Sequence, residues 1–217
     1  MNYGTTDGIL KPLSEVILPD PRFQGLVFES DSRPFELVDM HHRLSEMTLN
    51  PMLPADVRLQ FDTARNLMLY AWFVYEFQTI AELQGYAALE LALRLRFPEA
   101  KREVHRKGGI QVVPLGLRAL LKMAVKEGLI VAEQLPAWER IQVRHKWHQD
   151  RSGVCFGRPP SVSEWQDAIM DTIPNLRNGL AHGYPRLSLF DSINSLELCA
   201  DLINALFASL TSSRVRD

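Results

Sequence analysis

Hydrophobic residues recur at steps of three and four over most of the chain, which is the period of an amphipathic α-helix. The longest such stretch runs from about residue 55 to residue 97 and predicts continuous helix. Its apolar positions are Leu59, Ala64, Leu67, Ala71, Val74, Phe77, Ala81, Tyr86, Leu89, Leu93 and Phe97. Aromatic residues between positions 72 and 77 make the middle apolar nearly all round, which predicts burial on several sides. Pro98 ends the stretch.

Shorter amphipathic stretches follow and predict further helices. They cover residues 115–126, 136–148, about 161–173, 174–182 and 189–210. Pro174 is expected to end one helix and begin the next, because proline lacks a backbone N–H and is tolerated in the first turn. Residues 98–113 and 149–160 are predicted to be connections. The sequence thus predicts an all-α fold, a helical bundle with a long central helix.

The N-terminal part of the chain has a different pattern. Its first 35 residues are rich in proline and glycine, and two β-like runs, residues 26–28 and 35–38, flank a turn-like segment. This arrangement suggests a short β-hairpin. We therefore divide the chain into an irregular N-terminal extension, residues 1–54, and a helical domain, residues 55–217.

Composition narrows the function classes. A formal net charge of −2 leaves no overall excess of positive charge for non-specific nucleic-acid binding, so any RNA contact must come from a local patch. Cys155 and Cys199 are too few for a disulfide framework. The N-terminus lacks the pattern of a signal peptide, and the most apolar run, residues 67–77, is too short for a bilayer span of about 20 residues. We expect a soluble cytoplasmic protein with no membrane segment.

The segment Arg177-Asn178-Gly179-Leu180-Ala181-His182-Gly183 is the strongest candidate for chemistry. On a helical wheel Asn178 and His182 lie about 40° apart and share a face, whereas Arg177 lies about 140° from His182. A fixed cation beside a titratable ring can cleave a phosphodiester without a metal. The imidazole moves protons, and the guanidinium stabilises the charge that develops on the phosphate.

This segment resembles the signature of the HEPN superfamily of small helical ribonucleases and nucleic-acid-binding domains. That signature is an Arg, usually followed by a polar residue, and a His after four to six intervening residues; here Asn178 to Ala181 intervene. The spacing alone is not specific, because Arg140 and His145 repeat it without the polar and small flanking residues. Asn178, Ala181 and Gly183 around the pair make a chance match of the whole segment far less likely.

The resemblance implies a metal-independent endoribonuclease that needs no cofactor. Arg and His residues of two protomers would meet across a homodimer interface and cut RNA to a 2′,3′-cyclic phosphate, in a toxin–antitoxin or phage-defence system. One alternative is a non-catalytic HEPN-like module that binds RNA, nucleotide or a protein partner. Another is that the segment matches by coincidence in a helical scaffold protein.

Three further residues have two interpretations each. Asn178 either has a role in the site, in which it binds the phosphate or orients His182, or makes a structural bond to the backbone. Tyr184 matches the position of a tyrosine that is modified in HEPN toxins paired with a nucleotidyltransferase antitoxin, or it is a packing residue. Glu90 lies among leucines on the long helical stretch, where it either pairs with Arg177 or faces solvent.

A local basic run is the clearest candidate for contacts with the RNA backbone. Its members are Arg94, Arg96, Lys101, Arg102, Arg106 and Lys107. They outnumber Glu99 and Glu103, although a charged helix end is the commoner explanation of such a run. His145, His148 and Cys155 lack the spacing of metal ligands, so we predict no metal site.

Overall fold

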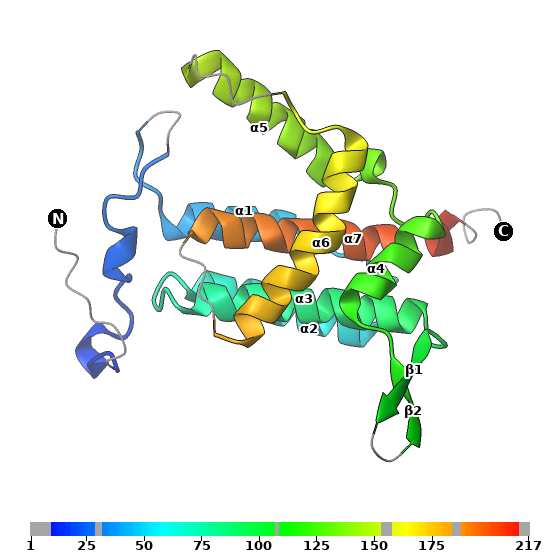
Figure 1. The fold of residues 1–217 in the computed structure, drawn as a ribbon. Helices are drawn as coiled ribbons and strands as arrows, with labels where there is room; N and C mark the ends of the chain where they lie inside the picture. Colours follow the sequence, from blue (N-terminus) through cyan, green and yellow to red (C-terminus); the bar gives the residue numbers. More distant parts are fainter. Residues whose placement is uncertain (1–9, 29–31, 107–108, 153–157, 184–187, 213–217) are drawn as a thin grey trace.

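The computed structural model describes residues 10–28, 32–106, 109–152, 158–183 and 188–212, and these are mostly helical (Figure 1). The helices are α1 (Leu37–Glu46), α2 (Ala55–Tyr70), α3 (Phe77–Arg96), α4 (Leu117–Lys126), α5 (Pro136–Ser152), α6 (Val162–Ala181) and α7 (Leu189–Ser212). The strands β1 (Lys101–Arg106) and β2 (Gly109–Pro114) form one antiparallel sheet. The predicted all-α bundle is confirmed at this level. None of the described helices has the length and apolar character needed to cross a bilayer.

Helix α3 lies at the centre of the molecule. It packs against α2 and α7, and it also contacts α4 and α6 (Figure 1). Tyr86, Leu89 and Leu93 of α3 are almost completely buried. The contact with α7 is close at Gly85, where an added Cβ would lie 2.4 Å from Cδ2 of Leu196. Only a glycine accommodates this approach without a shift of the neighbouring side chain.

The long helical stretch is two helices rather than one, so the prediction of continuous helix was wrong at residues 71–76. The chain turns there through backbone hydrogen bonds between residues three apart. The Trp72 N–H donates to the Leu69 carbonyl, and the Phe73 N–H donates to the Tyr70 carbonyl. Asp20 holds this corner, because its N–H donates to the Trp72 carbonyl at 2.8 Å and its carboxylate accepts from the Tyr75 N–H at 3.2 Å. The apolar period continues through the corner, which conceals the break in the sequence. Leu59, expected in the core, is 69% exposed.

Two other element predictions were also wrong. Helix α6 runs through Pro174 without a break. An interior proline costs about 3 kcal/mol, and burial of Pro174 with Ile169 and Ile173 offsets that cost. Residues 98–113, expected to be a connection, contain β1 and most of β2, because the β-branched residues of 110–113 pair with β1.

At the N-terminus the expected hairpin is reduced to a single bridge between Val27 and Pro34. Residues 37 and 38, expected in its second strand, begin α1 instead. A capping box formed by Glu36 and Asp39 starts this helix. Met40 and Leu44 of α1 are buried in the same core as α3 and α7. The boundary drawn at residue 54 stays a prediction.

Candidate functional site

Arg177 of α6 forms an ion pair with Glu90 of α3, with 3.2 Å between Nη2 and Oε2. The other carboxylate oxygen of Glu90 accepts a hydrogen bond from Arg94, one turn further along α3. The Glu90 side chain is only 14% exposed, so the solvent-facing interpretation of this residue was wrong. A carboxylate this far from water is stable only when it is paired, and the pairing fixes the position of Arg177.

Arg177 also lines a cavity of about 650 Å³. Its walls come from α3, β1, α4 with the segment that leads into it, and α6. Figure 1 shows these four elements in the same half of the bundle, with α4 between α6 and the β1–β2 sheet. Four residues singled out in the sequence meet here, namely Glu90, Arg102, Arg177 and Asn178. Arg118, Lys122 and Asn175 line the same cavity. The described lining therefore carries four cations and one carboxylate, an excess of positive charge that favours anions.

His182 directly follows the last residue of α6. It is the C-cap of α6, it is exposed, and its backbone N–H donates to the Asn178 carbonyl at 3.0 Å. Gly183 follows with φ +83°, the left-handed conformation expected of a glycine at a helix end. His182 is not among the described residues that line the cavity with Arg177. It follows Asn178 by about 6 Å along the same exposed face of α6.

The described members of the predicted basic run have different surroundings. Arg102 faces the cavity, Arg94 is paired with Glu90, and Lys101 lies 3.5 Å from Glu99. Arg96 is half-buried. The side chain of Arg106 and the whole of Lys107 and Tyr184 lie outside the described residues. The predicted roles of these three residues stay predictions.

Sequence reasoning missed Arg118 and Lys122. Both lie on the polar face of α4, whose opposite face is buried through Leu117, Leu120, Leu121 and Ala124. Arg118 donates to the Asn175 amide oxygen at 3.1 Å and lies 3.5 Å from Asp171. The i, i+4 spacing of Arg118 and Lys122 on an amphipathic helix was the sequence feature that could have identified them as neighbours. The sequence did not show that α4 would lie beside α6.

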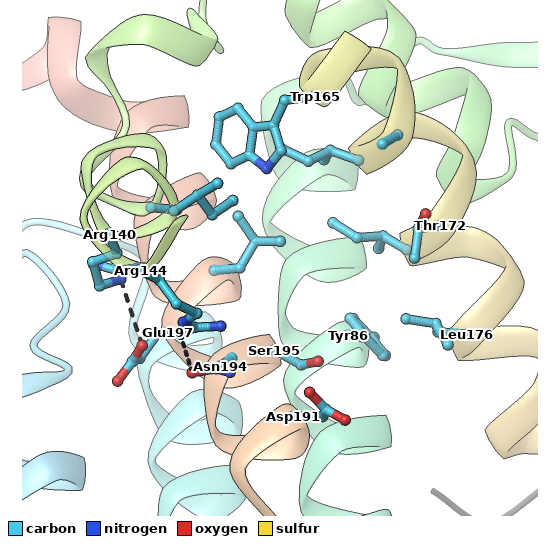
Figure 2. A pocket seen from close by; sticks show the side chains of 16 residues that line it. Tyr86, Arg140, Arg144, Trp165, Thr172, Leu176, Asp191, Asn194, Ser195 and Glu197 are labelled. Atoms are coloured by element: carbon cyan, nitrogen blue, oxygen red, sulfur yellow. Dashed lines mark hydrogen bonds and ion pairs between the residues drawn. The ribbon is translucent and has the colours of Figure 1, made fainter. Parts of the chain in front are cut away.

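Arg140, the arginine of the repeated spacing, forms ion pairs between two helices. Arg140 of α5 forms ion pairs with two carboxylates of α7. Its Nη2 lies 2.5 Å from Oδ2 of Asp201, and its Nε lies 3.5 Å from Oε2 of Glu197. Burial raises the pKa of Asp201, although the Arg140 charge opposes this change. Figure 2 shows a second cavity, of about 280 Å³, in which Arg140 and Arg144 reach Glu197 and Asn194. Arg140 therefore joins two helices, and its charge is already compensated.

Tyr86, which lines the same cavity, belongs to a buried polar network. The Tyr86 hydroxyl donates to Oε1 of the fully buried Glu82 at 2.9 Å, and the Ser192 hydroxyl donates to its other oxygen at 2.9 Å. Burial, with the nearby Cys199 and Glu82, raises the pKa of Tyr86 far above its usual range. This network satisfies a carboxylate inside the bundle, so its evident role is structural.

Comparisons of this chain with models of known families, with curated proteins and with solved structures give no match. Within the described ranges no group of three or more His, Cys, Asp or Glu residues is placed to bind a metal ion.

Proposed function

We propose that the protein is a metal-independent endoribonuclease of the HEPN type, with a HEPN-like helical domain. The observation that carries this proposal is the position of Arg177. Glu90 holds its guanidinium at a cation-rich cavity, beside Asn178 and close along α6 to His182. These are the groups that transfer of a phosphodiester to a neighbouring hydroxyl requires.

In the proposed reaction, His182 as neutral imidazole takes the proton of the RNA 2′-hydroxyl. The 2′-oxygen then bonds to the adjacent phosphorus, and Arg177 stabilises the additional negative charge on the phosphoryl oxygens. The bond to the 5′-oxygen breaks, and an imidazolium returns a proton to that oxygen. The products are a 2′,3′-cyclic phosphate and a 5′-hydroxyl end. Asn178 contacts the phosphate from the same face as His182.

The proposal includes a homodimer. Arg177 and His182 project from α6 about 140° apart, and only Arg177 lines the described cavity. A second copy that docks at the exposed end of α6 would supply the complementary group. The cytoplasmic toxin–antitoxin or phage-defence setting, and a nucleotidyltransferase partner acting on Tyr184, follow from the resemblance alone.

A second candidate function is a non-catalytic module that binds RNA. The position of His182 outside the Arg177 cavity favours it, because the described cavity contains cations and amides but no imidazole. A module of this kind would bind phosphate without transferring protons.

Incubation of the purified protein with labelled RNA in EDTA distinguishes the two functions. We expect wild type to cut, and Arg177→Ala and His182→Ala each to lose at least about a hundredfold in rate. Arg140→Ala and His145→Ala are matched controls with the same spacing, and they should retain cleavage even if Arg140→Ala lowers the melting temperature. Tight binding without cutting would support the module instead, and cutting abolished by EDTA would contradict the metal-free mechanism.

A further inference from the structure

The cavity beside Arg177 is lined by three cations in addition to Arg177, whereas Glu90 is the single carboxylate in its described lining. Arg102 comes from β1, Arg118 and Lys122 come from α4, and each of these three side chains is exposed. The whole chain has a formal net charge of −2, so this concentration of positive charge is local. Four cations facing one cavity repel one another, and a bound polyanion would relieve that repulsion.

The backbone adds to this positive field. The start of α4 lines the cavity through residues 115–119, and the N-cap residue Gly116 provides no side-chain cap to the first turn. An added Cβ at Gly116 would have no atom within 4 Å, so the described part of the protein leaves this helix start open. The first N–H groups of a helix and its dipole favour a negative charge at this position.

Arg118 of α4 can exchange its partners. Arg118 contacts only exposed groups among its described partners, Asn175 and Asp171. Surface pairs of this kind contribute about 0–1 kcal/mol, so an incoming phosphate can replace them. Arg177, in contrast, is held by the poorly exposed Glu90. The cavity therefore combines one fixed guanidinium with adaptable cations around it.

We propose that Arg102, Arg118 and Lys122, with the start of α4, form a phosphate-binding subsite for the backbone of single-stranded RNA next to the bond that is cut. Arg118 and Lys122 are one turn apart, about 6 Å along α4, so the charges are spread along the cavity rather than focused on a single anion. This subsite extends from Arg177 toward α4, on the side of Asn178 away from His182. The identification of the strand as RNA rests on the proposed function.

Fluorescence anisotropy with a labelled single-stranded DNA oligonucleotide tests the subsite, because DNA has the same phosphates but lacks the attacking 2′-hydroxyl. Binding is measured over a series of salt concentrations for wild type, Lys122→Ala and Arg118→Ala. Each variant should bind about tenfold more weakly and should reduce the slope of log K against log salt by about 0.7, the value for one lost contact with a single strand. RNA of the same sequence should behave in the same way when the binding is measured with proteins that also carry His182→Ala, so that the RNA is not cut.

Lys126→Ala is the matched control. Lys126 is exposed on the same helix, one turn after Lys122, and is not among the described residues that line the cavity. It should keep the wild-type affinity and slope. Equal losses from Lys122→Ala and Lys126→Ala would overturn the subsite, as would a wild-type slope in Lys122→Ala and Arg118→Ala. Binding of adenosine monophosphate as tight as that of the oligonucleotide would overturn the assignment to a backbone.

The cleavage assay separates this proposal from the ribonuclease itself. In one outcome, Lys122→Ala weakens binding of the DNA, but Arg177→Ala and His182→Ala leave RNA cleavage unchanged. The subsite is then supported and the ribonuclease proposal fails. In the other outcome, RNA cleavage depends on Arg177 and His182, but Arg118→Ala and Lys122→Ala bind the DNA as wild type does. The ribonuclease proposal is then supported and the subsite fails.

Discussion

At the scale of single residues, Glu90 determines the position of Arg177. Glu90 is little exposed; one of its carboxylate oxygens accepts a hydrogen bond from Arg94, and the other forms the ion pair with Arg177. A freely rotating arginine would have to lose conformational freedom when it binds a phosphate, whereas a paired one has already lost it. We therefore regard Glu90 as a positioning residue for Arg177, not as a group that touches the substrate.

This role predicts that Glu90→Gln lowers kcat for RNA cleavage by at least about tenfold, because a small misplacement of a catalytic group is costly. Glu90→Asp should recover part of the loss, since it restores the charge. Steady-state kinetics measure both variants, and thermal unfolding checks that they are folded. Glu99→Gln is the control, because Glu99 is exposed. Wild-type kcat in a folded Glu90→Gln protein would contradict the positioning role.

At the scale of elements, the corner between α2 and α3 depends on Asp20, which comes from outside both helices. Burial tends to raise the pKa of Asp20, but hydrogen bonds from the Arg22 side chain and from the backbone N–H groups of Arg22 and Tyr75 outweigh it and lower the pKa. A carboxyl whose pKa is lower in the folded state stabilises the fold at pH values above its unfolded pKa, about 3.9. That stabilisation is lost as the pH falls through the folded pKa.

Asp20→Asn is therefore expected to reduce the free energy of unfolding by about 2 kcal/mol at pH 7. The difference from wild type should shrink as the pH is lowered below about 4, where wild type itself loses the interaction. Urea unfolding at a series of pH values measures this difference. Asp167→Asn, at an exposed position of α6, should change little. A constant difference at all pH values would show that the Asp20 charge is not responsible.

The elements also show how far the sequence could predict the structure. Apolar spacing predicted α4 and α7 well, and Gly183 predicted the end of α6. The corner at residues 71–76 has no proline or glycine, and a tertiary contact from Asp20 fixes it, so local reasoning could not find it. The pairing of Glu90 with Arg177, and the place of Arg118 and Lys122 beside them, depend on how α3, α4 and α6 pack together.

At the scale of the whole molecule, the proposed homodimer has a direct consequence. If Arg177 of one protomer acts with His182 of its partner, then Arg177→Ala and His182→Ala proteins mixed and allowed to exchange subunits should regain about one quarter of wild-type activity. Half of the dimers would then be mixed, each with one intact site and one empty site. Cleavage of RNA before and after mixing measures the effect. Persistent inactivity in dimers shown to have exchanged would place both groups within one protomer.

The chemical ends of the RNA products test the central claim, that the Arg177 and His182 site cuts RNA by attack of the 2′-hydroxyl. Mass spectrometry of RNA cut in EDTA should show 2′,3′-cyclic phosphate and 5′-hydroxyl ends with wild type, and neither end with Arg177→Ala or His182→Ala. Products with 3′-hydroxyl and 5′-phosphate ends, or intact RNA with wild type, would contradict the account.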